Sequence, residues 1–116
     1  MTIKNVLIVD DESSVRRTER KSLESEGYNV FEAKDGPEAL ERIKEIDDID
    51  LVIVDMFMPK MDGRELIEKI RTALGLTELK LLVATVATSE EVKKKMSDLN
   101  VVGFIQKPFD KDDFLD

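Results

Sequence analysis

The 116-residue chain contains no cysteine, no histidine and no tryptophan. The absence of cysteine excludes a disulfide framework and thiolate metal sites, and it suggests that the chain is not extracellular. The absence of histidine excludes nucleophiles activated by an imidazole, and it excludes imidazole-ligated zinc. Any metal ion bound here must therefore have oxygen ligands, which favours Mg²⁺, Ca²⁺ or Mn²⁺.

Positive charge is also scarce, because 18 Lys and Arg face 26 Asp and Glu, for a net charge of -8. This balance argues against nucleic acid or an anionic membrane as a partner of the segment. No apolar run approaches the roughly 18 residues of a transmembrane helix, and residues 1–9 do not form a signal peptide. We expect one cytoplasmic domain spanning residues 1–116.

Five short apolar, β-branched runs predict strands, and three of them are almost continuously apolar, which is typical of strands covered on both faces. The runs are Ile3–Val9, Tyr28–Glu32, Leu51–Val54, Lys80–Ala84 and Val101–Ile105. Amphipathic segments separate them. We expect helix caps at Asp35, at Asp62 and at Thr88, a weak first helix over Ser14–Glu26 that ends at Gly27, and a fragmentary last helix from Lys111.

This alternation of strands and helices predicts a doubly wound α/β domain with a five-stranded parallel sheet. Ligands of such sheets bind at the carboxyl ends of the strands. There the sequence places Asp10, Asp11, Asp55, Thr85 and Lys107. Crowded carboxylates stay ionised only beside a cation, so we expect Mg²⁺ among the three aspartates.

Each of these residues also has an ordinary interpretation. Glu12 and Ser13 are best read as caps of the first helix, and Asp55 could cap a turn. A threonine at a strand end is common, and a lysine before a proline is usually solvated. The functional interpretation of Thr85 and Lys107 depends on their position, because both lie on the edge where the acids converge.

Four motifs together resemble the receiver domain of two-component response regulators, both the single-domain chemotaxis type and the N-terminal domains of transcriptional regulators. They are Asp10-Asp11, Asp55-x-x-Met58-Pro59-x-Met61-Asp62-Gly63, Thr85, and Phe104-x-x-Lys107-Pro108-Phe109. The resemblance covers essentially the whole chain. It implies a flavodoxin-like fold with strand order 2-1-3-4-5.

By the same resemblance, Asp55 is the phosphoryl acceptor. Asp11 and Asp55 would bind Mg²⁺ (or Mn²⁺) directly, together with the backbone carbonyl of Phe57, and Asp10 would act through water. Lys107 would pair with the phosphoryl group, and Thr85 and Phe104 would form the switch pair.

The resemblance also implies the partners. The phosphoryl group would come from a sensor histidine kinase or a phosphotransfer domain, and an unknown output domain or protein target would read the switched face. The final helix is cut at its first turn, so either the natural protein continues into an output domain or the segment is trimmed.

The sequence departs from the family's usual pattern in three respects. Val86 stands where a small alanine is common, and we expect it to slow phosphotransfer from bulky donors. Phe57 and Ala87 offer no group that could orient an attacking water, so we expect a long-lived aspartyl phosphate. Phe104 has no hydroxyl, so its switching would depend on packing alone.

Two other functions compete with a signalling switch that turns over no substrate. An aspartyl phosphohydrolase would need a second aspartate two residues after Asp55, and that position is Phe57. A degenerate receiver that serves only as a docking module would have a broken acid cluster, whereas all five key positions are intact. The scattered glycines form no phosphate-binding loop, which excludes nucleotide binding by that route.

Overall fold

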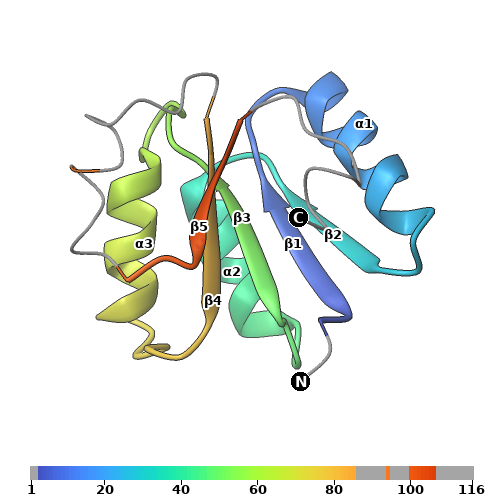
Figure 1. The fold of residues 1–116 in the computed structure, drawn as a ribbon. Helices are drawn as coiled ribbons and strands as arrows, with labels where there is room; N and C mark the ends of the chain where they lie inside the picture. Colours follow the sequence, from blue (N-terminus) through green and yellow to red (C-terminus); the bar gives the residue numbers. More distant parts are fainter. Residues whose placement is uncertain (1–2, 86–93, 95–99, 107–116) are drawn as a thin grey trace.

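The computed structural model describes residues 3–85, 94 and 100–106. In these ranges strands and helices alternate along the chain (Figure 1). The elements are β1 (Asn5–Val9), α1 (Ser13–Glu24), β2 (Asn29–Ala33), α2 (Gly36–Glu45), β3 (Leu51–Asp55), α3 (Gly63–Arg71), β4 (Lys80–Thr85) and β5 (Gly103–Gln106). The helices expected after Thr88 and from Lys111, and therefore the truncation of the last one, lie outside the described residues.

The strands form one parallel sheet in the order β2-β1-β3-β4-β5, which confirms the predicted flavodoxin-like α/β fold. The order reverses at β1, which pairs with β2 on one side and β3 on the other. This is the switch point at which open α/β sheets bind ligands, beyond the carboxyl ends of the strands.

Helices cover both faces of the sheet, with α1 on one side and α2 and α3 on the other (Figure 1). Alternate residues of each strand enter different apolar clusters, because successive side chains of a strand point to opposite faces. The face under α1 buries Val6, Ile8, Leu23, Ile53 and Ile105. The face under α2 and α3 buries Leu7, Val9, Val52, Val54, Leu66, Ile67, Ile70, Leu81 and Val83. Both faces of the sheet are thus covered by apolar side chains, as the continuous apolar runs predicted.

Two predicted helix caps are confirmed. The Asp35 carboxylate accepts a hydrogen bond from the Glu38 amide at 2.8 Å, and the Asp62 carboxylate accepts one from the Glu65 amide at 2.9 Å. Each bond satisfies a backbone donor that has no partner within the helix. Glu12 does occupy the N-cap position of α1, but the expected capping by its side chain is wrong, because that side chain makes no cap hydrogen bond.

Element ends differ from the predicted ends by one or two residues. Helix α1 stops at Glu24 rather than Glu26, because the amides of Glu26 and Gly27 donate to carbonyls only three residues back and the chain tightens into a turn. Gly27 then has φ +92°, the left-handed conformation expected of a residue that follows a helix.

Within the described ranges, no helix has the length and apolarity needed to cross a bilayer.

Asp50 joins the start of β3 to the start of β1. One of its carboxylate oxygens accepts hydrogen bonds from the backbone amides of Lys4 at 2.9 Å and Asn5 at 2.8 Å. The bonds from Asn5 and then Lys4 stabilise the ionised form and lower the pKa of Asp50. Their stabilising contribution is therefore complete above the ordinary pKa of an aspartate and is lost as the pH falls through the lowered one.

Asp50→Ala is expected to lower the free energy of unfolding by about 1 kcal/mol at neutral pH, the usual net value of such hydrogen bonds. The difference from wild type should shrink in acid, because the protonated carboxyl accepts these bonds poorly. Urea unfolding followed by circular dichroism at neutral and acidic pH measures both values. Asp47→Ala, at an exposed position nearby, is the control. A difference that is equally large in acid would contradict the assignment.

Candidate functional site

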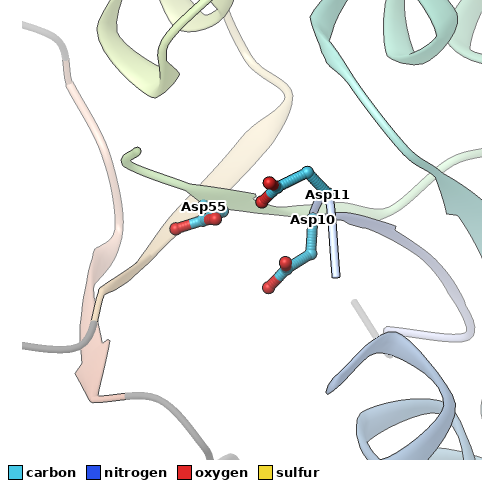
Figure 2. Close-up of side chains that lie close together, drawn as sticks. All are labelled: Asp10, Asp11 and Asp55. Carbon is cyan, nitrogen blue, oxygen red and sulfur yellow. The ribbon is translucent and has the colours of Figure 1, made fainter. Parts of the chain in front are cut away.

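Three aspartates meet at the carboxyl ends of β1 and β3. Asp10 and Asp11 follow β1, and Asp55 is the last residue of β3. Val9 and Val54 are partners in the parallel register, so Asp10 and Asp55, the residues that follow them, lie side by side at this edge of the sheet. Each aspartate offers a carboxylate oxygen, and these oxygens lie within 4.8 Å of one another. Figure 2 shows the three side chains close together. The structure brings together the three acids that the sequence placed at this edge.

The three aspartates differ in exposure. Asp10 and Asp55 are only 2% and 5% exposed, whereas Asp11 is exposed to solvent. The Asp10 carboxylate accepts a hydrogen bond from the Glu12 amide at 2.9 Å, and the Asp55 carboxylate accepts one from the Phe57 amide at 3.3 Å. Each buried carboxylate is thus oriented by an amide of the loop that follows it, and Asp11 leaves the cluster open on one side.

The chemistry of this cluster fits a divalent cation. Two unit charges 4.8 Å apart repel by about 3 kcal/mol at the effective dielectric constant of a protein surface. A cation among the carboxylates turns this repulsion into attraction. Mg²⁺ prefers oxygen ligands and usually binds one or two carboxylates, water and a phosphate oxygen. The donor set of this edge matches that preference.

The loop after Asp55 combines buried and exposed apolar side chains. Met56, Met58 and Met61 pack against the core on the α2 and α3 face, as expected for the first and the last of them. Phe57 is instead 61% exposed, beside the acid cluster. At the end of the loop, the amide of Gly63 donates to the Met56 carbonyl at 2.9 Å. The loop is therefore closed on itself directly after Asp55.

Two contacts connect this loop to the start of α2. The Lys60 ammonium lies 3.4 Å from the Asp35 carboxylate, and a Cβ added at Gly36 would lie 2.6 Å from the Met61 sulfur. The hydrogen bond from the Glu38 amide is the main cause that lowers the pKa of Asp35, and Lys60 contributes less. A side chain at Gly36 would therefore require Met61 to move.

Thr85 is completely buried at the end of β4 and follows Ala84, the register partner of Asp55. Phe104 is half-buried on β5, opposite Val83 in the register, and packs against the α2 and α3 face of the core. Alternation along β4 puts Val83 and Thr85 on the same face. Lys107, Val86 and Ala87 lie outside the described residues.

Arg16 and Glu32 lie next to the site, and the sequence analysis missed them. The Glu32 carboxylate accepts hydrogen bonds from Arg16 at 3.0 Å and from Arg20 at 2.7 Å. The spacing of the two arginines was the available signal, because residues four apart lie on the same face of a helix. That spacing could not show that their common partner is Glu32 on strand β2.

Comparison with known proteins agrees with this geometry. The family model of the response regulator receiver domain matches residues 6–116. The response regulator MprA of Mycolicibacterium vanbaalenii is 36% identical over 110 residues, which are 95% of this chain and 46% of MprA. The transcriptional regulatory protein PhoP of Bacillus subtilis is 35% identical over 107 residues, 91% of this chain and 43% of PhoP. The chain thus spans less than half the length of these curated relatives.

The solved structures show the same likeness. Chemotaxis protein CheY4 of Vibrio cholerae superimposes with a TM-score of 0.89 and 32% identity, covering 98% of this chain and 94% of CheY4. Receiver domains use Mg²⁺ at an acidic pocket, interact with histidine kinases and output domains, and are typically switches rather than enzymes. The match over nearly the whole chain and the shared fold lead to one conclusion: the chain belongs to the response regulator receiver domains, the phosphoacceptor switches of two-component systems.

Proposed function

We propose that Asp55 is the phosphoryl acceptor of this receiver domain. The observation that carries the proposal is the position of Asp55, buried at the end of β3 with oxygens of Asp10 and Asp11 within 4.8 Å. The donor would be a phosphohistidine of a sensor histidine kinase or phosphotransfer domain, or a small phosphodonor. The unit that is phosphorylated would be a single receiver domain over residues 1–116, acting in the cytoplasm.

Asp11, Asp55 and the backbone carbonyl of Phe57 would hold a Mg²⁺ ion, or Mn²⁺, with Asp10 acting through water. When bound, the ion supplies positive charge that neutralises the oxygens of the incoming phosphoryl group. The residues fit this role because the cluster offers only oxygen donors and has an exposed member, Asp11.

The carboxylate of Asp55 would act as the nucleophile. One of its oxygens forms a bond to phosphorus while the bond from phosphorus to the donor's imidazole nitrogen breaks, and the imidazole keeps that electron pair. No general base is required, because an ionised carboxylate carries no proton to remove. Lys107 would pair with the phosphoryl oxygens. The domain would thus promote its own phosphorylation, and also its own dephosphorylation at a slow rate, without being a turnover enzyme.

The switch pair, Thr85 and Phe104, would connect phosphorylation of Asp55 to the surface near β4 and β5. A phosphoryl group adds negative charge and acceptor oxygens beside Asp55, and the Thr85 hydroxyl would donate to one of them. Phe104, which is half-buried against the core, would then repack. The exposed face around these strands would change, and an output domain or protein target would read it.

Incubation with acetyl phosphate and Mg²⁺, followed by mass spectrometry, tests this function. A stable added phosphate on the peptide that contains Asp55 is the expected result. Steady release of inorganic phosphate without an adduct would instead indicate a phosphohydrolase. Absence of both, in folded protein, would indicate a docking module. Either of the last two results would overturn the proposal.

Phe57→Asn is expected to shorten the lifetime of the phosphorylated form severalfold. Phe57 is exposed beside the cluster and has no polar group, whereas an asparagine amide there could orient an attacking water. The decay of purified phosphoprotein, followed by mass spectrometry, gives both half-lives. Phe57→Leu is the matched control and should decay at the wild-type rate. A wild-type half-life no longer than that of Phe57→Asn would contradict this explanation.

A further inference from the structure

Arg16 of α1 joins the acid cluster to the neighbouring strand β2. Its Nη1 donates to the backbone carbonyl of Asp10 at 2.5 Å, and its Nε donates to the Glu32 carboxylate at 3.0 Å. The side chain is only 16% exposed, although it carries a charge. A planar guanidinium offers donors in a fixed geometry, so the two contacts together define where it lies.

Glu32 is itself fixed from several directions. Its other carboxylate oxygen accepts from Arg20 at 2.7 Å, and its backbone carbonyl accepts from Arg42 of α2 at 3.3 Å. Burial raises the pKa of Glu32, but the hydrogen bonds from Arg20 and Arg16 outweigh burial and bring it below the ordinary value. Glu32 is thus a charged acceptor that holds Arg16 in place.

The bond from Arg16 acts on the part of the chain that carries the first two aspartates. The Asp10 amide donates to the Ala33 carbonyl of β2 at 3.1 Å, and the Asp10 carbonyl accepts from Arg16. That carbonyl belongs to the peptide group between Asp10 and Asp11. Because a peptide group is planar, holding it fixes the direction in which the chain continues to Asp11.

We infer that Arg16, held by Glu32, is a positioning residue of the acid cluster, which sets the backbone of Asp10 and Asp11 for binding a divalent cation. The inference rests on the proposed Mg²⁺ site. Groups that orient metal ligands without touching the metal commonly change its affinity about tenfold or more when they are removed.

Charge and position predict opposite results for a variant of Arg16. Arg16 carries a positive charge and contacts the backbone of the acid cluster, so removal of its charge would by Coulomb's law alone tighten Mg²⁺ binding. If Arg16 positions the aspartates, its removal weakens Mg²⁺ binding in spite of that gain. The sign of the change therefore distinguishes the two effects.

Titration calorimetry with Mg²⁺ at fixed ionic strength, on the folded 116-residue chain, tests the inference. We expect Arg16→Gln to bind Mg²⁺ about tenfold more weakly than wild type. Arg16→Lys keeps the charge but cannot make both contacts, so it should bind with an intermediate affinity. Arg17→Gln removes the same charge from an exposed neighbour and should bind at least as tightly as wild type.

Hydrogen exchange without metal supplies a second readout. The Glu12 amide, which donates to Asp10, should exchange faster in Arg16→Gln while amides of β3 stay as slow as in wild type. Wild-type or tighter Mg²⁺ binding by Arg16→Gln, or unchanged exchange at Glu12, would overturn the inference. Failure of the proposed function looks different, because wild-type protein itself would then bind no Mg²⁺.

Discussion

Asp55→Asn is expected to abolish phosphorylation by acetyl phosphate. The amide is nearly isosteric with the carboxylate but is a poor nucleophile, and it removes one of the three charges that gather at this edge. A charged interaction is worth about 1.5–3 kcal/mol, so Mg²⁺ affinity should also fall roughly tenfold to hundredfold. Mass spectrometry and calorimetry on the same preparation measure the two effects.

Asp48→Asn is the matched control for this experiment. Asp48 is exposed between α2 and β3, and it has φ +66°, a conformation that asparagine tolerates as readily as aspartate. This variant should be labelled and should bind Mg²⁺ as wild type does. Labelling of folded Asp55→Asn at the wild-type level would show that another residue accepts the phosphoryl group.

Gly63→Ala is expected to destabilise the domain by about 3 kcal/mol, the upper end of the usual cost of overpacking. A Cβ at this position would lie 2.7 Å from the Asp55 carbonyl oxygen and 2.8 Å from the Met56 Cα. Both are backbone atoms, so the end of β3 must move. In an exposed helix the same substitution would stabilise by about 1 kcal/mol, so the two effects have opposite signs. Urea unfolding measures the change.

Gly103→Ala provides the comparison for this substitution. A Cβ on Gly103 would lie 3.6 Å from the Leu82 Cδ1, an ordinary contact, and the residue is at the start of β5. The free energy of unfolding of this variant should stay within about 0.5 kcal/mol of the wild-type value. If Gly63→Ala were as stable as Gly103→Ala, the close packing beneath Asp55 would not be a constraint on the site.

The fold followed from local patterns that tertiary structure did not override. Continuous apolar runs such as Leu51–Val54 predicted strands buried on both faces, and β3 is buried throughout. Capping residues predicted where α2 and α3 begin. Helix α1 was the weakest prediction because it has few large apolar residues, and its ends were misplaced by one and two residues. It also buries Glu19, which its hydrophobic pattern did not indicate.

The acid cluster was predictable for a topological reason. Parallel strands place their carboxyl ends on one edge, and β1 and β3 are neighbours in the sheet, so Asp10 and Asp55 lie near each other. The contacts of Arg16 were not predictable in this way. They depend on the rotation of α1 about its axis and on the register of β2, which no local sequence pattern specifies.

Calorimetric titration of the native protein with Mg²⁺ determines whether the three carboxylates within 4.8 Å of one another form a divalent-cation site. We expect each chain to bind one ion, with an affinity roughly tenfold or more weaker in Asp11→Asn and unchanged in Asp47→Asn. No uptake by folded native protein, or equal uptake by Asp11→Asn, would contradict it.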